Sequence, residues 1–68
     1  MTTINFEKEL YSKSAIKQAI NDFSAFVQGN VSEKEGVLRV DLKVLKGETE
    51  QVKKEFGNYV LGLTKEMC

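Results

Sequence analysis

The feature that most constrains the fold is the stretch of residues 36–45, in which apolar and polar side chains strictly alternate. The apolar positions are Leu38, Val40, Leu42 and Val44, and the polar positions between them are Arg39, Asp41 and Lys43. This period of two is typical of a half-buried β-strand. One face of such a strand must be covered while the other can stay in water, so we expect the rest of the chain to supply a single layer of cover.

Two further strands are predicted before this one. In residues 2–10, Ile4, Phe6 and Leu10 fall on one side, and Thr3, Asn5, Glu7 and Glu9 fall on the other. A short strand is expected at residues 30–33. The charged tetrad of residues 33–36 ends in glycine, which suits a hairpin loop into the alternating strand.

Two amphipathic helices are predicted. The first is capped by Ser12 or Ser14 and is ended by Gly29 and Asn30, which tolerate positive φ. Its apolar stripe is Ala15, Ile16, Ala19, Ile20, Phe23, Phe26 and Val27. The second is capped by Thr49 and runs over residues 50–65, with its apolar stripe at Val52, Phe56, Tyr59, Val60 and Leu63. Each helix therefore has one face suited to lie on a sheet.

These elements assemble into one α+β domain spanning residues 1–68. We expect a two-layer sandwich in the order β-α-β-β-α, with a three-stranded antiparallel sheet of order 1-3-2 and both helices on one face. The arrangement is similar to a ferredoxin-like split βαβ fold without its final strand. The first strand then has an unpaired edge, which is either a template for a partner strand or an edge kept solitary by the charges of Glu7, Lys8 and Glu9.

Composition weakens the case for nucleic-acid and membrane binding. The formal net charge of the chain is +0 and the signs are mixed along it, whereas phosphate binding needs concentrated positive charge. The polar face of the predicted sheet carries no aromatic residue for base stacking. No apolar run approaches the roughly 20 residues that cross a bilayer. A single cysteine, Cys68, excludes an internal disulfide, so we expect a cytoplasmic protein.

The residues for catalysis are also lacking. The chain has no histidine, which removes the commonest general base and nitrogen metal ligand. Cys68 has neither a histidine nor a second thiol to work with. The carboxylate pairs Glu33 with Glu35 and Glu48 with Glu50 are expected to be solvated. We therefore predict that the protein is not an enzyme and holds no metal or cofactor.

Three segments resemble a known family. They are residues 6–11 (Phe-Glu-Lys-Glu-Leu-Tyr), residues 15–19 (Ala-Ile-Lys-Gln-Ala) with Phe23, and residues 55–61 (Glu-Phe-Gly-Asn-Tyr-Val-Leu). They are similar to the small D component of the bacterial His-Xaa-Ser systems, in which a strand ending in Leu-Tyr leads to a helix with an Ala-Ile and Ala-aromatic pattern, and a C-terminal helix carries Glu-Phe-x-Asn-x-x-Leu. Gly57 departs from this pattern, because it replaces a usual large apolar residue.

The resemblance implies an accessory protein that serves radical S-adenosylmethionine enzymes which modify a ribosomally made peptide, without a cofactor of its own. Our leading hypothesis is therefore a protein that binds the maturase or its peptide. The alternative is a structural homodimer joined through the edge of the first strand, without a separate ligand.

The candidate contact residues fall in three places. Along the first strand they are Asn5, Glu7 and Glu9, and on the outer face of the first helix they are Gln18 and Asn21. The last is Asn58, an asparagine in a helix interior beside a glycine, where helix propensity gives no reason for it.

Overall fold

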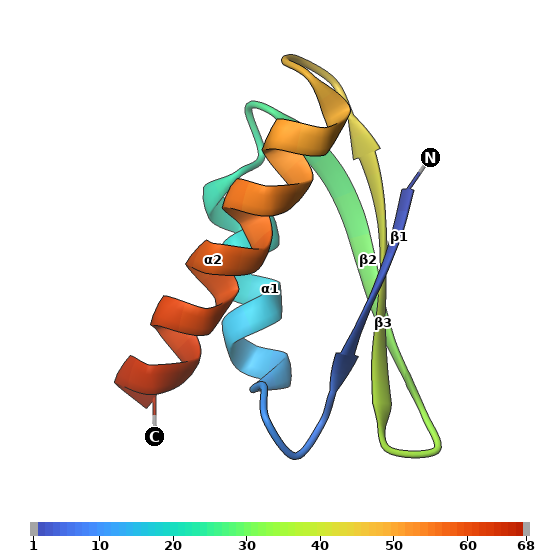
Figure 1. The fold of residues 1–68 in the computed structure, drawn as a ribbon, viewed down its shortest axis with the longest axis vertical. Helices are drawn as coiled ribbons and strands as arrows, with labels where there is room; N and C mark the ends of the chain where they lie inside the picture. Colours follow the sequence, from blue (N-terminus) through green and yellow to red (C-terminus); the bar gives the residue numbers. More distant parts are fainter. Residues whose placement is uncertain (1, 68) are drawn as a thin grey trace.

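The computed structural model describes residues 2–67. It contains, in chain order, β1 (Thr2–Glu7), α1 (Lys13–Asp22), β2 (Val27–Lys34), β3 (Val37–Val44) and α2 (Thr49–Met67). The strands form an antiparallel sheet of order β1-β3-β2, and both helices cover the same face of it (Figure 1). The predicted α+β architecture and strand order are thus confirmed.

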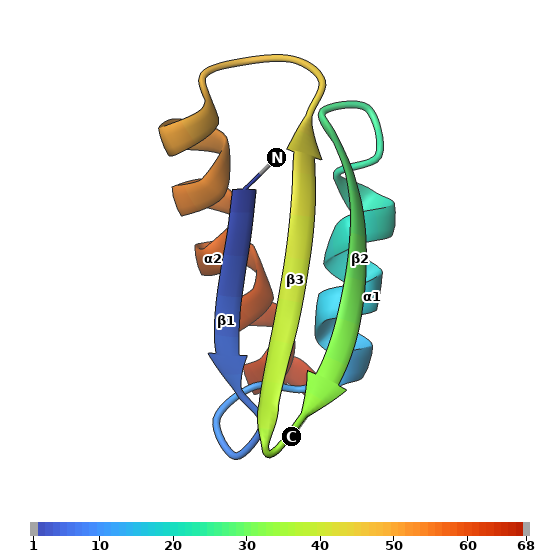
Figure 2. The ribbon, with the colours of Figure 1, turned by 90° about the vertical axis from the view of Figure 1, so that its right-hand side faces the viewer.

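The alternating strand lies at the centre of the sheet. Leu38, Val40 and Leu42 are fully buried on the face that the helices cover, while Arg39 and Lys43, which alternate with them, are exposed. Figure 2 shows α2 behind β1 and α1 behind β2, with β3 between the two edge strands. Each helix therefore covers one half of the sheet.

A tight hairpin turn fixes the register of β2 and β3. Lys34 is paired with Val37, so the loop consists of Glu35 and Gly36 alone. Both have positive φ, at 51° and 79°, the conformation that a two-residue turn needs to follow the twist of its strands. The loop is therefore shorter than the predicted tetrad.

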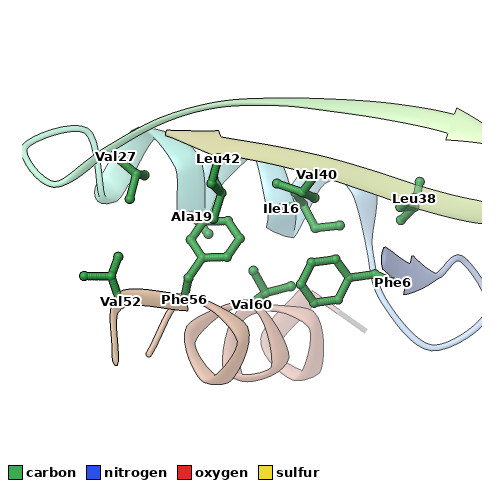
Figure 3. Packing of buried hydrophobic residues seen from close by; sticks show 10 residues of the cluster. All are labelled: Phe6, Ile16, Ala19, Val27, Leu38, Val40, Leu42, Val52, Phe56 and Val60. Carbon is green, nitrogen blue, oxygen red and sulfur yellow. The ribbon is translucent and has the colours of Figure 1, made fainter. Parts of the chain in front are cut away.

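The core lies between the covered face of the sheet and the two helices. Phe56 is the largest fully buried side chain, and it points from α2 toward Ala19 and Leu42, while Val60 lies beside Phe6 (Figure 3). The whole cluster is Phe6, Ile16, Ala19, Val27, Leu38, Val40, Leu42, Val52, Phe56 and Val60. Every element contributes to it, so none of the described helices and strands is independent of this core.

The first helix is shorter than predicted, and the second strand is longer. α1 ends at Asp22 with Phe23 as its C-cap, and the N–H groups of Phe26 and Val27 then donate to the carbonyl of Phe23 in a tight turn. Gly29 does not end a helix, because it lies in β2 opposite Leu42. The apolar residues after Phe23 fit a helical spacing and a strand spacing equally, and tertiary packing selects the strand.

Gly29 is required by close packing. A Cβ at this position would lie 2.6 Å from Leu42 Cδ2 and 3.5 Å from Ile20 Cγ1. The absent side chain makes room for the side chain of Leu42 on the neighbouring strand β3, which is a use of glycine in a strand that its own neighbours in sequence do not reveal.

Some apolar residues that were expected in the core are partly exposed. Phe26 is 44% exposed and Tyr59 is 38% exposed. Phe26 belongs to the turn after α1 rather than to its apolar stripe. Leu10 is 64% exposed, because β1 ends at Glu7 and not at Leu10.

The helix starts also differ from expectation in detail. The hydroxyl of Ser12, and not that of Ser14, accepts a hydrogen bond from the N–H of Ala15 at 3.3 Å. Thr49 is the first residue of α2 and not its N-cap. The N–H of Val52 already donates to the carbonyl of Glu48, so this helix begins one residue earlier.

Candidate functional site

The free edge of β1 carries backbone groups that can pair with another strand. The N–H of Lys8 donates to the carbonyl of Gly36 at 2.9 Å, so the backbone groups of Lys8 turn toward β3. Those of successive strand residues turn to opposite sides in an antiparallel ladder. It follows that the N–H and C=O groups of Thr3 and Asn5 and the N–H of Glu7 turn away from β3, toward the free edge. The C=O of Glu7 is already used, because it accepts from the N–H groups of Leu10 and Tyr11 at 3.0 Å each.

A groove runs beside this edge, between β1 and α2. Its volume is about 400 Å³. It is lined by Ile4, Phe6, Tyr11, Glu50, Lys53, Lys54, Gly57, Asn58 and Leu61. The strand and the turn after it contribute apolar side chains, of which Phe6 and Tyr11 stack edge to face with centroids 4.8 Å apart. Side chains of an added strand that pointed toward the helical layer would enter this groove.

Gly57 leaves open space on the groove side of α2. A Cβ built on it would meet no atom within 4 Å, so packing within the chain does not require a glycine here. A glycine inside a helix costs roughly 1 kcal/mol relative to alanine. The space at Gly57 is therefore available to a group from outside the chain.

The edge of β2 differs in this respect. A Cβ at Gly29 would clash with the side chain of Leu42 on β3, so this strand has no spare room at that position. The hollow on that side is smaller, about 270 Å³, and is lined by Lys17, Ile20, Gly29, Asn30 and Val31. The β1 side thus offers more room for the side chains of an added strand.

Lys8 does not guard the free edge of β1. Its Nζ forms an ion pair with Glu33 of β2, which lies on the far side of β3. The hydrogen bond from Lys8, and to a smaller extent the charges of Lys8 and Lys13, hold the pKa of Glu33 below its ordinary value against a partial opposing effect of desolvation. The lysine is thus directed across the sheet, which leaves Glu7 and Glu9 as the charges that could keep this edge solitary.

Three of the predicted contact residues lie in β1 or in the turn directly after it. Asn5 and Glu7 are exposed at the edge, and Glu9 is exposed in the turn that follows. Glu7 and Glu9 also border a shallow hollow of about 570 Å³ near the hairpin turn. Asn58 of α2 lines the groove, so the structure brings it to the same side of the molecule.

Gln18 and Asn21 lie elsewhere, on α1. Both are exposed, and the side-chain amide of Gln18 donates to Asp22 Oδ1 at 2.8 Å. α1 lies behind β2, on the opposite half of the sheet from β1 (Figure 2). These two residues are therefore not part of the β1 edge.

Asp22 also links the two helices. It accepts a hydrogen bond from the hydroxyl of Tyr59, which raises the pKa of that phenol, with further contributions from desolvation and from the charges of Asp22 and Glu66. Phe23 and Phe26, together with Asp22, line a second hollow of about 390 Å³ near the loop that precedes α2. It is the place where the unexpectedly exposed Phe26 meets solvent.

The open face of the sheet is polar. Across it, Asn5 is paired with Arg39, which is paired with Ser32. Thr3 donates its hydroxyl to Asp41 at 2.8 Å, and Arg39 contacts the same carboxylate at 3.3 Å. The polar side chains of this face are thus paired with one another at a surface exposed to water.

Sequence reasoning missed most of the groove. Ile4 and Phe6 were expected in the core, and Lys53, Lys54 and Leu61 were not considered as contact residues. The signal that could have found them is the helical spacing of residues 50, 54, 57, 58 and 61, which places them on one face of α2. Only the position of α2 behind β1 shows that this face borders an open edge.

The described residues offer neither a metal site nor a membrane-spanning helix. Among residues 2–67, no group of histidine, cysteine, aspartate or glutamate side chains is arranged to hold a metal ion. Within the same range, neither helix has the length and apolar character needed to cross a membrane. Comparison of the chain with models of protein families, with curated proteins and with solved structures found no match.

Proposed function

We propose that this protein is a non-catalytic binding module that takes an extended segment of a partner protein as an additional strand at the β1 edge. The observation that carries the proposal is the coincidence of the free backbone groups of Thr3 and Asn5, and the free N–H of Glu7, with the groove beside them. Backbone hydrogen bonds would provide affinity, and the groove would provide selectivity for side chains.

The groove defines the kind of segment that fits. Alternate side chains of an added strand would lie over Ile4 and Phe6, so they should be apolar. The other side chains would continue the polar open face beside Asn5. A regular alternation of apolar and polar residues in the partner segment is therefore expected.

The partner itself is proposed from the resemblance to the D component of the His-Xaa-Ser systems. It would be a radical S-adenosylmethionine maturase or its precursor peptide. In this role the protein brings no cofactor and performs no chemical step. It holds one component of the modification system in an extended conformation.

The test is affinity capture with the tagged chain of residues 1–68 in its native cells, followed by mass spectrometry, with Asn5→Pro and Val31→Pro alongside wild type. The backbone N–H of Asn5 turns to the free edge, so proline there removes a donor while sparing the ladder with β3. Val31→Pro is the matched change at the other edge. Circular dichroism establishes that both variants are folded.

Recovery of a maturase or short precursor peptide by wild type and Val31→Pro, but not by Asn5→Pro, supports the proposal. A partner that is retained by Asn5→Pro contradicts binding at the β1 edge. A captured partner of another kind, lost only in Asn5→Pro, contradicts the link to peptide modification and leaves the edge as the binding surface.

A further inference from the structure

The free edge of β1 is complementary to itself. In an antiparallel pair of two β1 strands centred on Asn5, Thr3 of each copy lies opposite Glu7 of the other. The N–H and C=O groups of the two Asn5 residues then face each other, and the N–H of Glu7 faces the C=O of Thr3 of the other copy. The C=O of Glu7 takes no part, because it accepts from Leu10 and Tyr11 of its own chain. Neutral threonine opposes charged glutamate in this register, so no like charges lie directly opposite each other.

The same register matches the apolar side of the strand. Ile4 of each copy lies opposite Phe6 of the other copy. Pairs of an aromatic and a β-branched side chain stabilise antiparallel strands. Centring the pair on Phe6 instead would place Ile4 against Lys8. Centring it on Ile4 would leave Glu7 without an opposite residue in the strand. Pairing centred on Asn5 is therefore the register that satisfies both faces.

We propose that a second copy of this chain occupies the β1 edge, with the two Asn5 residues opposite each other at a two-fold axis, and that this self-association competes with the partner strand. The inference rests on the proposed function, because it assigns a second occupant to the same surface. The resulting sheet is continuous through both copies, and all helices lie on one side of it.

The position of Gly57 agrees with this arrangement. The groove beside β1 is lined by Ile4, Phe6 and Gly57, so Gly57 lies on the side of the molecule where the second copy is proposed to bind. A two-fold axis at Asn5 sets the two α2 helices antiparallel to each other, and the space left by the absent side chain of Gly57 can admit a group from the other copy. Leu61, which is 38% accessible in the single chain, lines the same groove.

The expected dimer is weak. Pairing of one short strand with a limited helix contact falls at or below about 1,200 Å² of buried surface, the range of transient interfaces. We expect a dissociation constant on the order of micromolar or higher. Such an association permits exchange with a partner strand, whereas a tight dimer would block it.

The first test is sedimentation velocity of the full chain over a wide concentration range. Wild type and Val31→Pro are expected to shift from monomer to dimer as concentration rises, and Asn5→Pro is expected to remain monomeric while folded. A wild-type chain that stays monomeric at millimolar concentration overturns the inference, as does a dimer that survives Asn5→Pro.

The second test examines the register and uses Cys68→Ser as background. Residues that lie directly opposite each other in antiparallel strands have Cα atoms about 5 Å apart, within the range of a disulfide. Asn5→Cys is therefore expected to form a covalent dimer under mild oxidation. Thr3→Cys alone is not, but it should cross-link to Glu7→Cys when the two proteins are mixed. Equal cross-linking of Thr3→Cys to itself contradicts the register.

The two proposals fail in different ways. If wild type is monomeric but its partner is lost in Asn5→Pro, the second copy is excluded and the binding function stands. If the chain dimerises in the predicted register and captures no other protein, the binding function fails and the self-association stands. If both occur, adding the partner should convert dimer to monomer bound to partner, and a dimer that persists at saturation contradicts the competition.

Discussion

Tyr59 of α2 donates its hydroxyl to the carboxylate of Asp22 at the end of α1, and the bond joins the two helices on their exposed side. The ring of Tyr59 also packs against Phe23, with centroids 5.2 Å apart. This relationship explains why a residue predicted for the core lies at the surface. The ring covers Phe23 while the hydroxyl remains close to water.

The Tyr59 phenol is expected to titrate above its ordinary pKa of 10.0, because ionisation breaks the bond to Asp22 and places two negative charges side by side. Because the pKa of Tyr59 is raised in the folded state, the bond stabilises the fold fully at pH values below the pKa of the unfolded chain. This stabilisation is lost as the pH rises through the pKa of the folded chain. Residue-resolved NMR of the tyrosine rings in an alkaline titration measures this. In Asp22→Ala the pKa should move back toward 10.0, whereas in Gln18→Ala it should remain raised.

Gly29→Ala is expected to destabilise the fold by about 1–3 kcal/mol, as overpacking of a closely packed position does. Its Cβ would lie 2.6 Å from Leu42 Cδ2 and 3.2 Å from the carbonyl oxygen of Asp41. Urea unfolding monitored by circular dichroism measures the free energy of unfolding. The backbone oxygen cannot turn away as a side chain can, so the strand itself must shift.

Gly57→Ala and Gly62→Ala are the matched controls for this effect. Neither added Cβ meets an atom within 4 Å, and both positions lie inside α2. Each should therefore stabilise the folded chain, by about 0.5–1 kcal/mol. A loss of stability in Gly57→Ala, or none in Gly29→Ala, would contradict the packing described for these glycines in α2 and β2.

The contrast between these glycines shows what the sequence could reveal. The central strand was predictable because its period is local, and two helices with one apolar stripe each then required a two-layer sandwich. The role of Gly29 depends on Leu42 and Ile20, which are neighbours only in the folded chain. Because glycine commonly ends a helix, the sequence predicts that α1 ends at Gly29. The predicted helix is therefore too long and the predicted β2 too short.

The candidate site was predictable to a similar extent. The strand order left β1 with an open edge, so Asn5 and Glu7 could be named from the sequence. The groove could not be described, because its shape depends on which face of α2 lies beside β1. Gln18 and Asn21 were chosen for a polar helix surface, which carries no information on the direction of that surface in the fold.

Ser12→Ala should lower the free energy of unfolding by about 1 kcal/mol, the usual cost of losing an N-cap. The Ser12 hydroxyl accepts from the N–H of Ala15, and its own N–H donates to the buried hydroxyl of Thr64 at 3.3 Å. Ser14→Ala is the control, since Ser14 is exposed and follows the cap. Equal stability of wild type and Ser12→Ala in urea unfolding would show that the cap contributes nothing.

Removal of the lysine partner of Glu33 should destabilise the chain slightly at neutral pH and not at all in acid. The pKa of Glu33 is lowered in the folded state. The Lys8–Glu33 ion pair therefore stabilises the fold at pH values above the ordinary pKa of 4.5, and this stabilisation is lost as the pH falls through the lowered pKa. Thermal unfolding of Lys8→Met and wild type across this range tests the sign, because methionine retains the aliphatic stem. A difference between the two that grows as pH falls would contradict the pairing.

Phe56→Ala is expected to leave the chain largely unfolded. Phe56 is completely buried and stacks edge to face on Phe23, with centroids 5.6 Å apart. Truncation of a core phenylalanine typically costs about 3–5 kcal/mol, which is comparable with the whole stability expected of a small domain at roughly 0.1 kcal/mol per residue. Phe26→Ala is the matched control, because Phe26 is 44% exposed and outside the core cluster. Circular dichroism and the dispersion of NMR signals should show a folded Phe26→Ala and a collapsed or unfolded Phe56→Ala, and the reverse order would place the core of this domain elsewhere.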